Sequence, residues 1–172
     1  MSKPKIAVII SSTRPTRFGD KPATWIAEHA AKRGDIDVEI VDLRDYDLPL
    51  FDAPASDAWM PTPNPVAAKW QAKLNEFDGF IIVTAEYNRS ITGALKNAID
   101  VGSRPYGKSA WSGKPGAVIS VSPGAIGGFG ANHHLRQSLV FLNVPCMQQP
   151  EAYLGGAGSF FEEAGMLGDG MR

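Results

Sequence analysis

Short apolar runs alternate along this chain with segments whose apolar residues recur at helical spacing. The runs Lys5 to Ser11, Gly79 to Thr84 and Gly116 to Ser122 are apolar almost throughout, which is typical of strands covered on both faces of a sheet. Two further strands are expected at Asp37 to Asp42, nearer the sheet edge, and at Val144 to Gln149. This alternation predicts an α/β fold: a doubly wound, five-stranded parallel sheet with helices on both faces.

The helical segments carry start and stop signals. The first begins near Asp20 and ends before Gly34, and the second follows Asn64, an amide suited to capping. The hydroxyl of Thr92 can cap the third, and the fourth places Leu135 inward after a glycine-rich stretch. After Glu163 the sequence becomes rich in glycine and methionine, so a closing fifth helix is not apparent.

Composition limits the class of protein. The chain has 172 residues with 44% hydrophobic content, which predicts a single domain over residues 1–172. A net charge of −1 argues against a nucleic-acid partner. The early apolar run Ile6 to Ile10 is far shorter than a membrane span, so we expect a cytoplasmic protein without a membrane partner. The single cysteine, Cys146, excludes an internal disulfide and a cysteine-rich metal site.

The loop after the first strand has the composition of an anion site. It contains Ser11, Ser12 and Thr13, followed by Arg14 and Arg17. A strand that ends in a hydroxyl-rich loop and opens a helix directs N–H groups and the positive helix end at a ligand. Arginine adds fork-shaped donors suited to a phosphate. The alternative is a solvated surface turn with neighbouring arginines.

Three loops of unusual chemistry leave the carboxyl ends of predicted strands. They begin at Ser11, Ala85 and Pro123. In open parallel sheets, ligands bind outside the carboxyl ends of the strands, at the point where the strand order reverses. Convergence of the three loops therefore favours a binding site over a surface turn.

Several phosphate-binding classes are excluded by residue type. The chain has no G-x-x-x-x-G-K-[ST] motif, and no G-x-G-x-x-G follows the first strand. Ser11 and Thr84 stand where a receiver domain needs carboxylates, and the phosphate loop has no cysteine nucleophile. What remains is a mononucleotide held by its phosphate, with a flat ring between the second and third loops.

At this point the chain resembles the NAD(P)H-dependent FMN reductase family of flavodoxin-like proteins. The matching segments are Ser12 to Gly19, Glu86 to Asp100, and Ser122 to Gly124 with the following Gly127 and Gly128. Glu-Tyr-Asn followed by Leu-Lys-Asn-Ala-Ile-Asp is the most specific part. The sequence departs from the family pattern at Ala85 and at Thr92, where proline is common in the family.

The resemblance implies a cytoplasmic flavoprotein oxidoreductase. FMN would take hydride from NADPH or NADH and pass electrons to a small acceptor such as a quinone or free flavin. It also implies a homodimer or homotetramer. Because the flavin carries the chemistry, no catalytic side chain and no metal ligand is expected. The expected FMN-binding residues are Ser11, Ser12, Thr13, Arg14, Arg17, Phe18, Glu86, Tyr87, Asn88, Arg89, Ser122, Pro123, Gly124, Gly127 and Gly128.

Two other functions stay open on the sequence. One is a flavodoxin-type electron carrier that binds FMN without its own NAD(P)H turnover, although the near-neutral charge and the two loop arginines are unusual for such carriers. The other is a non-catalytic nucleotide-binding or redox-sensing module. A further expectation is that Arg104 or Lys108 meets a phosphate of the nicotinamide nucleotide.

Overall fold

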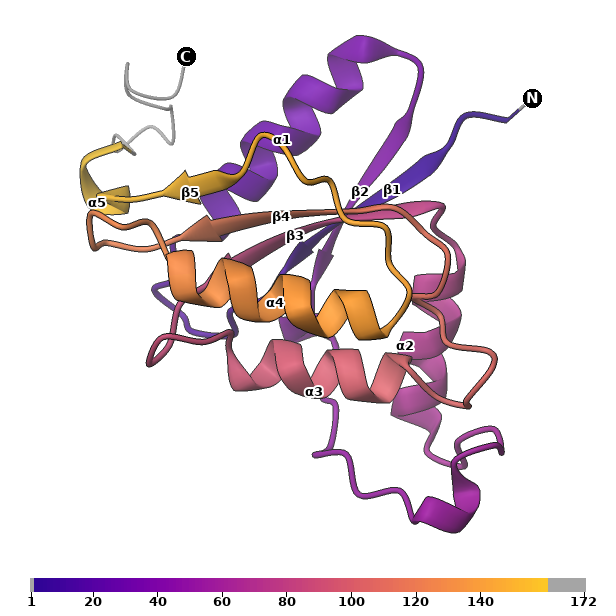
Figure 1. Cartoon of the computed structure of the whole chain (residues 1–172). Helices are drawn as coiled ribbons and strands as arrows, with labels where there is room; N and C mark the ends of the chain where they lie inside the picture. The colour runs from indigo at the N-terminus through magenta and orange to yellow at the C-terminus, as the bar shows by residue number, and fades with distance from the viewer. Residues whose placement is uncertain (1, 161–172) are drawn as a thin grey trace.

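The computed structural model describes residues 2–160, which form a parallel sheet flanked by helices (Figure 1). In this range the strands are β1 (Lys5–Ile10), β2 (Asp37–Asp42), β3 (Gly79–Ala85), β4 (Gly116–Val121) and β5 (Ala152–Leu154). The helices are α1 (Asp20–Arg33), α2 (Pro65–Asn75), α3 (Gly93–Gly102), α4 (Phe129–Phe141) and α5 (Ala157–Phe160), with the 3-10 turns η1 (Leu43–Asp45) and η2 (Ala55–Asp57).

Successive strand residues face opposite layers, which is why the central strands are apolar throughout. Val8 and Val83 belong to a core cluster shared with α1 and α5. Ile9 and Ile82 belong to a larger cluster shared with α2, α3 and α4. Figure 1 shows α1 on one side of the sheet and α2, α3 and α4 on the other. The predicted doubly wound fold is confirmed.

Helix ends follow the predicted signals. The Asn64 side chain accepts hydrogen bonds from the N–H groups of Val66 and Ala67 at the start of α2. Thr92 accepts from the N–H of Leu95 at the start of α3. Gly34 ends α1 with a φ of 74°, a left-handed conformation that glycine adopts without steric cost.

The fifth strand is not where the sequence analysis put it. The segment 144–149 makes one isolated bridge, from Cys146 to Gly116, and the ladder with β4 is formed by Ala152–Leu154 instead. Pro145 has no N–H to contribute to a ladder. Its carbonyl accepts from Gly116 N at 3.1 Å and the bridge is parallel, so the segment 144–149 runs beside the beginning of β4. The pairing strand forms only after the chain reaches the other end of β4.

The strand order is β2-β1-β3-β4-β5, with every pair parallel. From β1 the chain adds β2 on one side of the sheet, and then β3, β4 and β5 on the other side. Ligands of such sheets bind where this change of side occurs, so the carboxyl ends of β1 and β3 border the expected ligand crevice. Helix α5 starts at Ala157, whereas the expectation about a closing helix concerns residues after Glu163, outside the described range. Among the helices of the described range, none is long and apolar enough to cross a membrane.

Candidate functional site

Three loops meet at the carboxyl edge of the sheet, as the sequence predicts. We call them the β1 loop (residues 11–19), the β3 loop (residues 86–91) and the β4 loop (residues 122–128). The β1 and β3 segments are joined directly: Ala85 N donates to Ser11 Oγ at 3.2 Å, and Thr92 Oγ1 donates to the Ser11 carbonyl at 2.9 Å. A further hydrogen bond joins Ser12 Oγ to Tyr87 Oη at 2.8 Å. These contacts fix the two loops relative to each other before any ligand binds.

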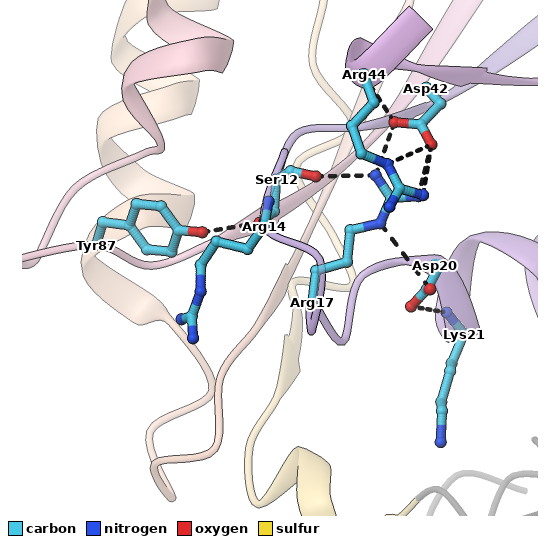
Figure 2. Close-up of polar contacts among 8 residues, drawn as sticks. All are labelled: Ser12, Arg14, Arg17, Asp20, Lys21, Asp42, Arg44 and Tyr87. Atoms are coloured by element: carbon cyan, nitrogen blue, oxygen red, sulfur yellow. Dashed lines mark hydrogen bonds and ion pairs between the residues drawn. The ribbon is translucent and has the colours of Figure 1, made fainter.

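The β1 loop has a buried base and an exposed tip. Ser11 and Ser12 are buried, and Thr13 and Arg14 are exposed. The backbone N–H of Arg14 lies 3.4 Å from Ser12 Oγ. Within residues 2–160 no hydrogen bond or ion pair engages the Arg14 guanidinium, and Figure 2 shows this side chain extending away from the Arg17 cluster. Arg14 is therefore available to an anionic ligand.

Arg17 is placed differently, although the sequence analysis grouped it with Arg14. Its side chain is only 3% exposed and forms a two-pronged pair with Asp42, at 2.7 and 2.6 Å. It also donates to the Ser12 carbonyl at 2.9 Å. Figure 2 shows Arg17 and Arg44 converging on the Asp42 carboxylate. Arg17 thus holds the loop in shape, and the neighbouring Phe18 packs against the core cluster under α1.

Asp42 is ionised over the whole physiological pH range. Burial opposes ionisation of this carboxylate, but the hydrogen bonds from Arg17 and Arg44 outweigh it and lower the pKa of Asp42 to about 2. Sequence reasoning missed both Asp42 and Arg44. The available signal was the position of Asp42 at the carboxyl end of β2, on the same sheet edge as the loop arginines.

The β3 loop forms a tight turn in an unusual conformation. Tyr87 N donates to the Ser90 carbonyl at 2.8 Å, and Ser90 N donates back to the Tyr87 carbonyl at 3.0 Å. The central residues Asn88 and Arg89 have φ values of 51° and 66°. Positive φ at both central positions is the geometry of a type I′ turn, which asparagine tolerates and arginine adopts at a steric cost. Backbone strain of this kind is concentrated at functional sites.

In the β4 loop, the predicted glycines serve different purposes. Gly127 and Gly128 are buried with φ values of 65° and 79°, and a Cβ at Gly127 would lie 2.8 Å from the backbone of Tyr153. Both are therefore required by the fold itself. Gly124 is exposed, and the one atom found near its missing Cβ is Ser122 Oγ at 3.6 Å, so open space lies beside it. Pro123 is also exposed.

Arg104 does not lie near these loops, and the expectation that Arg104 or Lys108 meets a phosphate of the nicotinamide nucleotide stays a prediction. Helix α3 begins beside the β3 loop and runs for 10 residues, a rise of about 15 Å, before Arg104 is reached. The Arg104 guanidinium carbon is 4.0 Å from the Tyr106 ring centroid and 5.1 Å from that of Phe51. Arg104 therefore packs against two aromatic rings beyond the C-terminal end of α3.

Comparisons with known proteins show which proteins this chain is similar to. The family model described as NADPH-dependent FMN reductase matches residues 4–159. A protein named quinone reductase from Pseudomonas putida is 52% identical over 167 residues, covering 97% of this chain and 86% of that protein. The solved structure of FerB, a flavoenzyme NAD(P)H:(acceptor) oxidoreductase from Paracoccus denitrificans, matches with a TM-score of 0.81 and 32% identity over 97% of this chain and 87% of that one.

A more distant likeness concerns the fold alone. A flavodoxin from Pseudomonas aeruginosa matches with a TM-score of 0.57 at 16% identity, covering 89% of this chain and 85% of that one. It supports the flavodoxin-like strand order described above. On the extent of the family match and the identity with these relatives, the chain belongs to the NADPH-dependent FMN reductase family.

Proposed function

We propose that this protein is an FMN-dependent oxidoreductase that takes hydride from NADPH or NADH and passes electrons to a quinone or another small acceptor. Family membership supports the reaction class. The name of the Pseudomonas putida relative, quinone reductase, supports the choice of acceptor. The observation that carries the proposal is the uncommitted Arg14 guanidinium above the buried serines of the β1 loop, at the sheet edge where the three loops meet.

The described residues fit FMN at this edge. The phosphate would lie at the β1 loop, near Arg14 and the Ser12 and Thr13 hydroxyls. Arg17 would act by holding the loop backbone, because its guanidinium is bound to Asp42 and to Ser12. The ring would lie between the β3 and β4 loops, where Gly124 leaves space for close approach.

FMN, when bound, supplies the hydride-accepting and electron-donating chemistry. The protein's part is to bind, orient and stabilise charge. Backbone N–H groups of Asn88 and Arg89 are fixed donors available to stabilise negative charge on the ring, whereas the Gly124 N–H already donates to Ser122 Oγ at 3.2 Å. The Tyr87 hydroxyl, bound to Ser12, keeps the ring-side turn and the phosphate loop at a constant separation.

The alternative function is a flavodoxin-type carrier, which would share the FMN site. The net charge of −1 disfavours it, because a carrier that docks protein partners by charge needs a marked field. The distinguishing property is direct reduction by NADPH, since a carrier accepts electrons only from a partner protein.

FMN binding tests the site assignment. FMN at a hundred times its dissociation constant stabilises a fold by about 2.7 kcal/mol, which raises the melting temperature measurably. We expect FMN to raise it more than FAD at equal concentration, and riboflavin to raise it least. An unchanged melting temperature with FMN alongside a rise with FAD would show that the site is assigned to the wrong flavin.

We also propose that the protein is a homo-oligomer in a reducing compartment such as the cytoplasm. Val140 and Phe141, at the end of α4, are 71% and 81% exposed, and adjacent apolar side chains of this kind suggest a covered surface. The single unpaired Cys146 supports the compartment. Sedimentation of Phe141→Glu beside the unchanged protein tests the assembly, with a smaller species expected for the variant.

A further inference from the structure

Helix α4 begins at the proposed ring site without a capping side chain of its own. Its N-cap is Gly128, at φ 79° and ψ 32°, which offers no side-chain acceptor. The first four N–H groups of a helix lack helical partners and carry the positive end of the helix dipole. One of them has a partner from a distant segment: the Ala131 N–H donates to Glu86 Oε2 at 3.1 Å.

Glu86 can approach α4 closely because the helix has a glycine at the contact. Glu86 directly follows β3, and its side chain is 15% exposed. A Cβ at Gly130 would lie 3.0 Å from Glu86 Oε2 and 2.7 Å from the Arg89 carbonyl oxygen, so the helix can accept this loop because position 130 has no side chain. A second hydrogen bond, His134 Nδ1 to Ser90 Oγ at 3.0 Å, joins the other end of the loop to α4.

The negative charge of Glu86 interacts chiefly with the positive N-terminal end of α4. The ion pair found for it among residues 2–160 is with Arg89, whose Nη1 lies 3.8 Å from Oε1. The Arg89 side chain is 77% exposed, so water screens this pair and leaves it weak. A carboxylate at a helix N-terminus offsets the positive partial charge of the exposed N–H groups. Glu86 thus changes the electrostatics of the edge that would face the flavin ring.

We propose that Glu86 is a positioning residue rather than a cofactor ligand. Its carboxylate caps α4 from the β3 loop, fixes the separation of the β3 and β4 loops, and offsets the positive helix end beside the ring site. The effect on the ring rests on the proposed function. The cap itself is a property of the flavin-free fold, and the two parts are therefore tested separately.

The cap is tested on the apoprotein with Glu86→Ala and Glu86→Gln. Loss of a helix cap in a domain of this size lowers the melting temperature by about 2 to 6 °C, which we expect for Glu86→Ala. Glutamine retains an acceptor oxygen, so Glu86→Gln restores most of that loss. Hydrogen exchange at the Ala131 amide is faster in Glu86→Ala than in the unchanged protein. Glu28→Gln on the exposed face of α1 is the charge-matched control.

The charge is tested on the FMN-bound protein. Removal of a negative charge near the ring makes reduction easier, so Glu86→Gln raises the midpoint potential of bound FMN and Glu28→Gln does not. Unchanged melting temperature and Ala131 exchange in Glu86→Ala would overturn the cap. An unchanged potential in Glu86→Gln would overturn the charge effect. A cap that behaves as expected in a protein that binds no flavin would support the cap and overturn the proposed function instead.

Discussion

Arg17 and Asp42 form a two-pronged ion pair, with Nη1 2.7 Å from Oδ1 and Nη2 2.6 Å from Oδ2. Arg17 belongs to the β1 loop and Asp42 ends β2, so the pair anchors the loop to the neighbouring strand. The same guanidinium donates to the Ser12 carbonyl, which sets the backbone beneath Arg14. The two arginines of the loop therefore have separate tasks: Arg17 holds the loop, and Arg14 is left for a ligand.

Replacement of Arg14 by alanine tests this division of tasks. A hydrogen bond to a charged group contributes about 1.5 to 3 kcal/mol, so Arg14→Ala should weaken FMN binding by about 10- to 150-fold. Riboflavin lacks the phosphate, and its affinity should change little. Fluorescence titration with both flavins measures the difference.

Arg17→Ala is the matched variant for that experiment. It leaves Asp42 without its main partner, so the apoprotein should lose stability and both flavins should bind more weakly. Equal losses of FMN and riboflavin affinity in Arg14→Ala would mean that Arg14 supports the loop and does not contact the phosphate.

The Asp42 pKa predicts an acid-dependent loss of stability. A carboxylate whose pKa is lowered in the folded state contributes stability above its unfolded pKa, near 3.8, and loses that contribution as the pH falls through about 2. The shift corresponds to roughly 2 kcal/mol of unfolding free energy. In Asp42→Asn this pH dependence should be missing, and at pH 7 the variant should be less stable by about 3 kcal/mol because Arg17 stays buried without its counter-charge.

Urea unfolding at pH 7, 4 and 2 measures both effects of Asp42→Asn. Asp35→Asn is a suitable control, because Asp35 forms an exposed pair with Arg33. Parallel pH profiles for the unchanged protein and Asp42→Asn would show that the pair with Arg17 adds no stability.

Alanine substitutions at two glycines of the β4 loop should affect different properties, fold stability at one and FMN binding at the other. Gly127 has a φ of 65° and no room for a Cβ, so Gly127→Ala should destabilise the fold by more than about 1 kcal/mol. Gly124 has open space, so Gly124→Ala should keep the melting temperature and weaken FMN binding, because the added methyl group lies where the ring would approach. Retained FMN affinity in Gly124→Ala would place the ring elsewhere.

The order of strands and helices could be predicted because each element carries its own periodicity and end signals. Asn64 and Thr92 cap α2 and α3 as their positions indicated. The prediction of the fifth strand was wrong because its position depends on pairing with β4, which the local sequence does not show. An edge strand forms where its partner offers a ladder, and β4 pairs with Ala152–Leu154, whereas the segment 144–149 makes only one isolated bridge to β4.

The site was predictable as a set of loops, but not in its internal contacts. Arg17 and Asp42 are 25 residues apart, and Glu86 and Ala131 are 45 residues apart. Residue type alone does not tell whether an arginine or a glutamate in a loop faces a ligand or another element. That depends on the three-dimensional fold, which determines which oppositely charged or polar groups lie close enough to pair with the side chain.

Direct reduction by the nicotinamide nucleotide tests the central claim, that this protein is a reductase and not a carrier. The FMN-loaded protein is mixed with NADPH, and separately with NADH, in an anaerobic cuvette, and the flavin absorbance is followed. We expect at least one nucleotide to bleach the flavin and a quinone to restore its colour. Flavin that stays oxidised with both nucleotides, yet is reduced by a separate reductase protein, would contradict the enzyme assignment and establish the carrier.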